Sequence, residues 1–422
     1  MKMPFYPADI LIPKTGLEKW SVIACDQYTS DPNYWEDVEN TVGDAPSTLR
    51  ITLPEIYLEK DDVEKRVEKI NETMAGYLEE GIFNEYKNTY IYVERTLRSD
   101  NVRQGIIGVI DLEDYDFAPD SKALIRATEK TVTERIPPRV KIRKNAPLEL
   151  PHIMILFDDP GNVIFSNIEK FKPLMEKIYS FKLMKNSGYI SGWDVGEAAR
   201  ECIDRGFEEL LARSIEHAGD REPIFFAVGD GNHSLATAKT CWEYIKPGLS
   251  EEERKTHPAR FALAEVVNIH DKSLDFEPVH RVIFGTDTEL FREELLKYFK
   301  DVIKEDVCDV NEFNDFVTVT EDINHVYELE TVEEKLPIAC VQEFLDYYLK
   351  NVDTGAKIDY IHGDGVAIEL GRKQGNVAVL MPSISKGDLF DMVMLAGVLP
   401  RKTFSMGEAD DKRFYIEAKK IK

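Results

Sequence analysis

A polar turn at residues 229–234 carries the side chains best suited to chemistry. Its sequence is Gly229-Asp230-Gly231-Asn232-His233-Ser234. Two glycines allow a tight backbone, and a helix starting here leaves free N–H groups that favour a phosphate or a carboxylate. Asp230 could hold a metal ion or accept a proton, and His233 could donate to a phosphoryl oxygen or act as a base. An ordinary helix cap, with His233 at the surface, explains the same residues equally well.

A second candidate is a run of positive charge at residues 126–144. Seven cations stand there against two glutamates, a local charge of about +5. The cations are Arg126, Lys130, Arg135, Arg139, Lys141, Arg143 and Lys144. Such an inversion in an acidic chain suggests an anion site, although the pattern alone favours a solvated helix face laced with ion pairs.

Other positions are weaker candidates. The polar segment 399–408 offers Arg401, Lys402 and Thr403 to a phosphate, but an ordinary turn explains it too. The dipeptide His280-Arg281 begins a predicted strand and could reach a site, although a structural pair is the favoured interpretation. Glycine-rich nucleotide motifs of the P-loop and Rossmann types are missing, which disfavours both classes of protein.

The elements that must position these residues alternate between helix and strand. Residues 224–228 are apolar without alternation and predict a strand covered on both faces, followed by a helix from about residue 233. An earlier apolar run, residues 21–25, leads into a polar loop that begins with Asp26, a common place for site residues. Apolar spacing predicts helices over 63–78 and 195–218 and a hairpin over 90–112. It also predicts three closing strands, at 358–362, 366–370 and 377–381. A hairpin turn at 363–365 is expected to join the first two of them. The fold class predicted is α+β, with mixed sheets and flanking helices.

Composition limits the functions that the chain could have. Its 422 residues include 53 Lys and Arg against 78 Asp and Glu, a formal net charge of −25. The average field repels polyanions, so nucleic-acid or membrane binding is not expected. No apolar run is long enough to cross a bilayer, and the five cysteines form no C-x-x-C pair, which predicts a soluble, cytoplasmic protein. We expect an N-terminal α/β region over 1–190 and a second region over 191–422. The sequence is also compatible with the assembly of identical chains into an oligomer.

Nearly the whole chain resembles a bacterial and archaeal family of unknown function whose members carry a D-G-H-H-R-like turn after a buried strand. Segments 20–34, 47–49, 126–143, 278–281 and 399–408 join the 227–234 turn in this resemblance. Residues 195–284 are similar to the ParB-like core found in chromosome-partitioning proteins, sulfiredoxin and a free serine kinase that uses ADP. Asn232 and Ser234 replace the first His and the Arg of the family turn, which weakens bidentate phosphate recognition there.

The resemblance implies a nucleotide- and Mg²⁺-dependent phosphotransferase acting on a small hydroxylated metabolite such as serine, with ADP or ATP as donor. A phosphatase of a phosphoserine-like compound is one alternative. A non-catalytic nucleotide sensor is the other, and the missing helix-turn-helix and basic surface disfavour it. Asp230, His233 and Asp26 are the predicted catalytic residues, with Asp230 holding Mg²⁺ and Asp26 as base. The predicted phosphate and nucleotide ligands are Gly229, Gly231, Asn232, Ser234, Arg126, Lys130, Arg135, Arg139, Arg143, Arg281, Arg401, Lys402 and Thr403.

Overall fold

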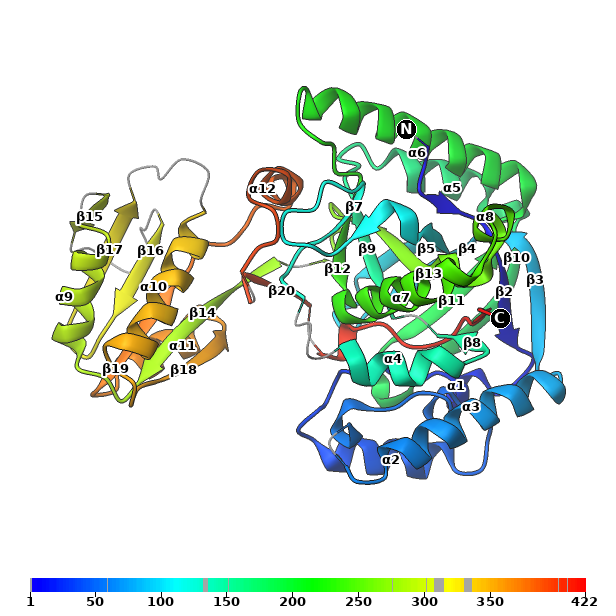
Figure 1. The fold of residues 1–422 in the computed structure, drawn as a ribbon, viewed down its shortest axis with the longest axis horizontal. Helices are drawn as coiled ribbons and strands as arrows, with labels where there is room; N and C mark the ends of the chain where they lie inside the picture. Colours follow the sequence, from blue (N-terminus) through cyan, green and yellow to red (C-terminus); the bar gives the residue numbers. More distant parts are fainter. Residues whose placement is uncertain are drawn as a thin grey trace. The chain divides into compact units, whose positions relative to one another are not determined.

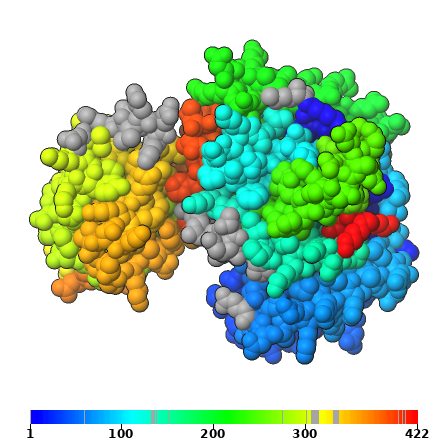
Figure 2. All heavy atoms as spheres, viewed as in Figure 1, coloured from blue at the N-terminus to red at the C-terminus, as the bar shows by residue number. Residues whose placement is uncertain are grey.

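The computed structural model divides the chain into two compact units (Figures 1 and 2). The first unit comprises Met1–Leu274 and Gly407–Lys422, and the second comprises Asp275–Met406. The structure describes residues 2–58, 60–131, 136–150, 152–274, 276–300, 302–306, 315–329, 336–400, 402–407 and 409–422. The chain therefore leaves the first unit once and returns to it with its last residues.

A ten-stranded mixed sheet forms the centre of the first unit. Strands β12 and β7 run parallel, as do β13 and β9, whereas β12 and β9 run antiparallel. The order is β10 (Glu176–Lys182), β11 (Tyr189–Asp194), β4 (Ile91–Thr96), β5 (Val102–Asp111), β13 (Phe261–Asn268), β9 (Met154–Phe157), β12 (Phe226–Asp230), β7 (Ile125–Ala127) and β6 (Tyr115–Asp116), with β1 (Phe5–Tyr6) on β5.

Apolar side chains on both faces of this sheet explain its two covering layers. In β5, Ile106 and Ile110 join one core cluster, and Ile107 and Val109 join another, because successive side chains point to opposite faces. The first cluster is covered by α5 (Val163–Phe171), α6 (Gly196–Ala218) and α7 (Asn232–Ile245). The second is covered by β2 (Ala8–Pro13), α2 (Pro32–Val42) and residues near the C-terminus.

Smaller elements complete the first unit. Strand β2 pairs with β3 (Phe83–Thr89), and β8 (Leu148–Glu149) pairs with β21 (Lys419–Lys420). A third apolar cluster packs α3 (Val63–Glu79) against residues of α1 (Leu17–Trp20) and α4 (Ile136–Asn145). The short α8 (Glu251–Thr256) begins with a capping box made by Ser250 and Glu253. Figure 2 shows the red C-terminal segment beside green residues, in agreement with a hydrogen bond from Lys419 to the carbonyl of Pro258.

The second unit has a seven-stranded sheet of its own. Its order is β15 (Ile303–Asp306), β17 (Asn324–Leu329), β16 (Phe316–Val319), β19 (Asn376–Leu380), β14 (Phe276–Phe284) and β18 (Lys357–His362), with β20 (Phe404–Met406) on β14. Helices α9 (Thr288–Tyr298) and α10 (Pro337–Asn351) share an apolar cluster with the sheet, and α11 (Asp364–Gly371) packs on β19; α12 (Leu389–Ala396) precedes β20.

The structure confirms the α+β class, its mixed sheets with flanking helices, and the buried strand, turn and helix at residues 224–245. The strand predicted at 366–370 is wrong, because these residues lie in α11, and residues 363–365 begin that helix rather than a hairpin. A short apolar run does not distinguish a strand from a helix.

The domain boundary expected at residue 190 falls inside β11, which is paired on both sides within the large sheet. The units divide near residues 274 and 407 instead.

Candidate functional site

The site is built around the turn that joins β12 to α7. Gly231 has a left-handed φ of 80°, and a Cβ atom there would lie 3.0 Å from the Cα atom of Ile153, so both its conformation and its surroundings require glycine. Helix α7 begins at Asn232, and no side chain of the described residues caps it. The Oδ1 atom of Asn232 is buried without a hydrogen-bond partner in the described part of the chain. This helix start therefore keeps N–H groups that are suited to an anion.

Strand pairing brings His152 to this turn. Because β9 runs antiparallel to β12, the start of β9 lies beside the end of β12, and Met154 pairs with Asp230. His152 lies two residues before that strand and is 5% exposed. Its Nε2 atom lies 3.2 Å from the Oγ of Ser234, in the first turn of α7. The imidazole thus reaches the N-terminus of the helix.

The C-terminal segment brings further groups to the site. Ile23 bridges to Phe414, and Ala24 N–H donates to the carbonyl of Arg413 at 2.9 Å, so residues 22–26 lie along residues 412–415. This alignment places the ammonium of Lys412 3.3 Å from the Oδ2 atom of Asp230. The C-terminal residues are therefore part of the site's construction.

His152 is the meeting point of these segments. Its Nε2 atom lies 3.6 Å from the Oδ2 of Asp26, and its Nδ1 lies 2.8 Å from the hydroxyl of Tyr415. The same hydroxyl accepts a hydrogen bond of 3.2 Å from the N–H of Cys25. Each ring nitrogen of His152 therefore has a polar neighbour, as a charged imidazolium requires.

The charges of the site stabilise one another. Burial opposes a charged imidazole, but the carboxylates of Asp26 and then Asp230 outweigh it and raise the pKa of His152 above 6.5. Burial likewise disfavours an ionised Asp26, yet His152, the amide of Gln27 and Lys412 together lower the pKa of this carboxyl well below 3.8. Burial raises the pKa of the Cys25 thiol to about 11, and the charge of Asp26 adds to the effect. The thiol stays protonated at neutral pH, which argues against a cysteine nucleophile.

A cavity of about 140 Å³ adjoins this cluster and reaches His152, Ser234 and Tyr415. Arg139 and Arg143, one helical turn apart on α4, line it as well. Arg139 pairs with Glu55, and Arg143 pairs with the buried Glu149. Apolar side chains form most of the remaining wall. The cavity thus offers two arginines whose charges are already balanced, rather than free cations.

The structure gathers part of the predicted site. Asp26, Asp230, Ser234, Arg139 and Arg143 lie around His152 or the adjoining cavity. Gly229, Gly231 and Asn232 form the turn, and His233 lies half-buried in the first turn of α7 with its carbonyl accepting from Thr237. Neither Asp230 nor His233 lines the 140 Å³ cavity.

Other predicted ligands lie elsewhere. Arg126 is buried and donates to the carbonyls of Ala123, Glu222 and Pro223, so its guanidinium holds loops together. Lys130 is exposed. Arg135 and Arg401 lie outside the described residues.

Three more of the predicted ligands belong to the second unit. Arg281 is buried against the ring of Tyr360 and bonds to Gln342, as a structural residue would. Lys402 is exposed, and the buried Thr403 donates to the carbonyl of Pro400. His280 contacts Asp364 at 2.8 Å, so its imidazole has a partner within the second unit.

Magnesium does not fit Asp230 in this arrangement. One carboxylate oxygen accepts from the N–H of Gly231 at 2.9 Å, and the other faces Lys412. Across the described residues, no three His, Cys, Asp or Glu side chains are grouped so that they could hold a metal ion. The ammonium of Lys412 therefore stands where a metal ion bound to Asp230 would be expected.

Sequence reasoning missed the groups that complete the cluster. His152 stands at the start of an apolar stretch and, as a single histidine without a motif, carries no signal of its own. Lys412 and Tyr415 lie in the last residues of the chain, where only the pairing with residues 22–24 reveals their place. Glu55, the partner of Arg139, is one of many glutamates in an acidic chain.

Comparison with known proteins finds distant structural similarity. A conserved hypothetical protein from Pyrococcus furiosus is 10% identical, with a TM-score of 0.37, and the alignment covers 75% of this chain and 95% of that one. A free serine kinase in complex with AMP is 11% identical, with a TM-score of 0.38 and coverage of 74% and 90%. SbnI with a C-terminal truncation, from Staphylococcus aureus, is 12% identical, with a TM-score of 0.36 and coverage of 74% and 82%. None of the curated proteins matches.

Two findings concern the chain as a whole. Within the part that the structure describes, none of the helices combines the length and the apolar composition needed to span a bilayer. A family profile described as "Protein of unknown function (DUF1015)" matches residues 6–348. Since this match extends over most of the sequence, the chain belongs to the DUF1015 family.

Proposed function

We propose that this protein is a nucleotide-dependent phosphotransferase that moves a phosphoryl group between ADP or ATP and a small hydroxylated metabolite. The observation that carries the proposal is the uncapped N-terminus of α7, with His152 against its first turn. Phosphoryl transfer depends on positioning and on positive charge near the transferring oxygens. The N–H groups at the start of α7, the imidazolium of His152 and the ammonium of Lys412 supply that charge in one place.

The reaction breaks the bond between the transferred phosphorus and the oxygen of the nucleotide, and forms a bond from phosphorus to the metabolite's hydroxyl oxygen. Asp26 accepts the hydrogen bond of that hydroxyl and takes its proton. A carboxylate with a lowered pKa is a weak base, but a loose transition state needs alignment of the acceptor more than a strong base. Serine is the first acceptor to test, because the strand, turn and helix at 226–245 resemble the core of the free serine kinase.

The experiment mixes purified protein with ADP or ATP, Mg²⁺ and a panel of hydroxylated metabolites, and follows phosphorylated product by mass spectrometry. Asp230→Asn should lower turnover, because it removes the carboxylate that positions the ammonium of Lys412. Asp100→Asn is the matched control, because Asp100 is exposed at the turn between β4 and β5 and has a φ of 64°, which asparagine also adopts. A parallel reaction with EDTA tests the predicted dependence on magnesium.

Two results would count against the proposal. Release of inorganic phosphate from phosphoserine without any nucleotide would identify a phosphatase instead. Failure of the protein to bind either nucleotide by calorimetry, or full activity of Asp230→Asn protein, would remove the phosphotransferase mechanism.

A further inference from the structure

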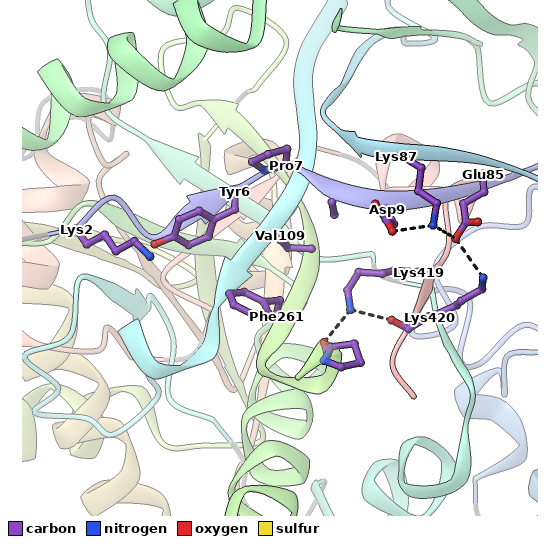
Figure 3. A pocket seen from close by; sticks show the side chains of 12 residues that line it. Lys2, Tyr6, Pro7, Asp9, Glu85, Lys87, Val109, Phe261, Lys419 and Lys420 are labelled. Atoms are coloured by element: carbon purple, nitrogen blue, oxygen red, sulfur yellow. Dashed lines mark hydrogen bonds and ion pairs between the residues drawn. The ribbon is translucent and has the colours of Figure 1, made fainter. Parts of the chain in front are cut away.

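A larger cavity, of about 440 Å³, opens elsewhere in the first unit (Figure 3). Its walls come from the N-terminal strands β1 and β2, from β3, β5 and β13, and from the C-terminal strand β21. Pockets that hold small molecules have volumes of roughly 300–1,000 Å³. None of the residues predicted from the sequence to bind phosphate or nucleotide lines this cavity. It is therefore separate from the site at α7.

The floor of the cavity is apolar and aromatic. The rings of Tyr6 and Phe261 meet edge to face with their centroids 6.1 Å apart, and Val109 lies beside them. Pro7, Ala8 and Pro258 extend this surface. Aromatic and aliphatic walls of this kind bury the ring or chain of an organic ligand and favour its transfer from water.

The rim of the cavity is positively charged. Four lysines, Lys2, Lys87, Lys419 and Lys420, line it together with only two acidic side chains, those of Asp9 and Glu85. Since Lys419 lies 3.5 Å from the buried Glu149, the other three lysines leave a surplus of about one positive charge, in a chain whose formal net charge is −25. Such local inversion concentrates small anions at the cavity and is not explained by the average surface of the protein.

The two acidic groups are already shared among the lysines. Lys87 lies 2.9 Å from both Asp9 and Glu85, and Lys420 lies 3.1 Å from Glu85. Figure 3 shows these groups at one end of the cavity and Lys2 with Tyr6 at the other. The ammonium of Lys2 lies 4.8 Å from the centroid of the Tyr6 ring, and its charge also acts on the carboxyl group of Asp114. Positive charge thus flanks the aromatic floor on both sides.

Lys419 is fixed differently from the other three lysines. It is 5% exposed, and its ammonium donates to the carbonyls of Pro258 and Lys420 at 2.8 and 3.0 Å. Burial lowers its pKa, although Glu149 opposes that effect. Lys419 therefore shapes the wall, while Lys2, Lys87 and Lys420 keep ammonium groups that can turn towards a ligand.

We propose that this cavity is a binding site for a small organic anion, whose apolar ring lies on Tyr6 and Phe261 and whose single acidic group is held by the lysines at one end of the cavity. The ligand must carry an apolar ring, because the floor of the cavity offers apolar contact and few hydrogen bonds. The negative charge is required because the lysines outnumber the acidic side chains. A neutral compound of the same shape would use only the floor.

The test uses two probes that share an aromatic body. 8-Anilinonaphthalene-1-sulfonate carries one negative charge, and N-phenyl-1-naphthylamine is the same body without the sulfonate. We expect the sulfonate probe to saturate one site per chain in a fluorescence titration. The Lys2→Met, Lys420→Met double variant should bind it about tenfold more weakly, as expected from losing a hydrogen bond to a charged group. Affinity for the neutral probe should stay within about twofold, because methionine preserves the apolar length of the side chain.

Two further variants sharpen the result. Asp9→Asn removes a competing negative charge and should tighten binding of the sulfonate probe, while its amide oxygen can still accept from the N–H of Asn88. Lys65→Met, at an exposed position of α3, is the control for loss of a lysine and should change nothing. Equal loss of both probes in the double variant, or the same sulfonate affinity in every variant, would overturn the proposal. Circular dichroism verifies that each variant is folded.

Discussion

His152 and Asp26 lie 3.6 Å apart at the site, and a third segment ties them together. The hydroxyl of Tyr415 lies against His152 on one side and accepts from the N–H of Cys25, the neighbour of Asp26, on the other. Three stretches of chain that are far apart in the sequence thus meet at one imidazole. The charges of the ion pair depend on this packing, because the histidine is buried and needs a partner to remain protonated.

The first prediction concerns the pH range in which this pair contributes to stability. The folded-state pKa of His152 is raised above 6.5, so its contribution is complete below pH 6.5 and is lost as the pH rises through the folded pKa. The folded-state pKa of Asp26 is lowered below 3.8, so its contribution is complete above pH 3.8 and is lost as the pH falls through the folded pKa. Both contributions are therefore present between pH 3.8 and 6.5.

An NMR titration of the His152 ring protons measures this directly. We expect a midpoint above 6.5 in the parent protein and a clear downward shift in Asp26→Asn protein, because burial then opposes protonation with less compensation. An unchanged midpoint in the variant would show that Asp26 does not hold the charge of His152.

The second prediction concerns the ion pair of Asp230 and Lys412. Both side chains are 19% exposed, so water screens their attraction only in part. A double-mutant cycle with Asp230→Asn and Lys412→Met should give a coupling free energy of about 1 kcal/mol in urea unfolding. The same cycle on Glu252 and Lys255, which are 84% and 62% exposed, should give a coupling near zero. Equal couplings in the two cycles would contradict a special environment at Asp230.

Patterns within short stretches of sequence predicted the elements that such stretches determine by themselves. The continuous apolar run at 224–228 followed by two glycines predicted a buried strand, a turn and a helix, and all three are present. His152, Lys412 and Tyr415 could not be found in this way, because strand order and the return of the C-terminal segment bring them to the turn. The charge of residues 126–144 was visible, but which arginines face a cavity depends on how α4 packs.

The third prediction separates Arg126 from the cations of the site. Its guanidinium donates to three loop carbonyls and is 4% exposed, so Arg126→Met leaves those acceptors without their donor. We expect a loss of about 2–3 kcal/mol in the free energy of unfolding, measured with urea. Nucleotide affinity, measured by calorimetry below the unfolding transition, should be unchanged. A selective loss of nucleotide binding at full stability would return Arg126 to the list of ligands.

The fourth prediction concerns Glu149, which is 5% exposed. Its carboxylate pairs with Arg143, lies 3.5 Å from the ammonium of Lys419, and accepts from the N–H of Leu263 at 2.8 Å. Glu149→Gln leaves two cations without their counter-charge and should destabilise the fold by about 3–5 kcal/mol. Glu64→Gln, at a side chain that is 85% exposed, should change stability by less than about 0.5 kcal/mol. Comparable urea midpoints for the two variants would refute the structural role of Glu149.

The last prediction concerns Gly231, where backbone conformation and packing act together. Gly231→Ala must hold alanine at a φ of 80°, which costs about 1–2 kcal/mol, and the new Cβ would lie 3.0 Å from the Cα atom and 3.2 Å from the Cγ1 atom of Ile153. Gly16→Ala is the matched control, because Gly16 has nearly the same left-handed conformation, with φ 73° and ψ 27°, and its Cβ would meet no atom within 4 Å. The difference between the two losses of stability therefore isolates the contact with Ile153 from the strain that both variants share.

A second measurement follows from the position of Ile153, which is next to His152. If the added methyl group displaces Ile153, the ring signals of His152 should shift in Gly231→Ala protein and remain unchanged in Gly16→Ala protein. Equal destabilisation by the two substitutions, with no shift at His152, would show that the turn tolerates a side chain. It would also mean that the close approach of Gly231 to β9 does not position the histidine.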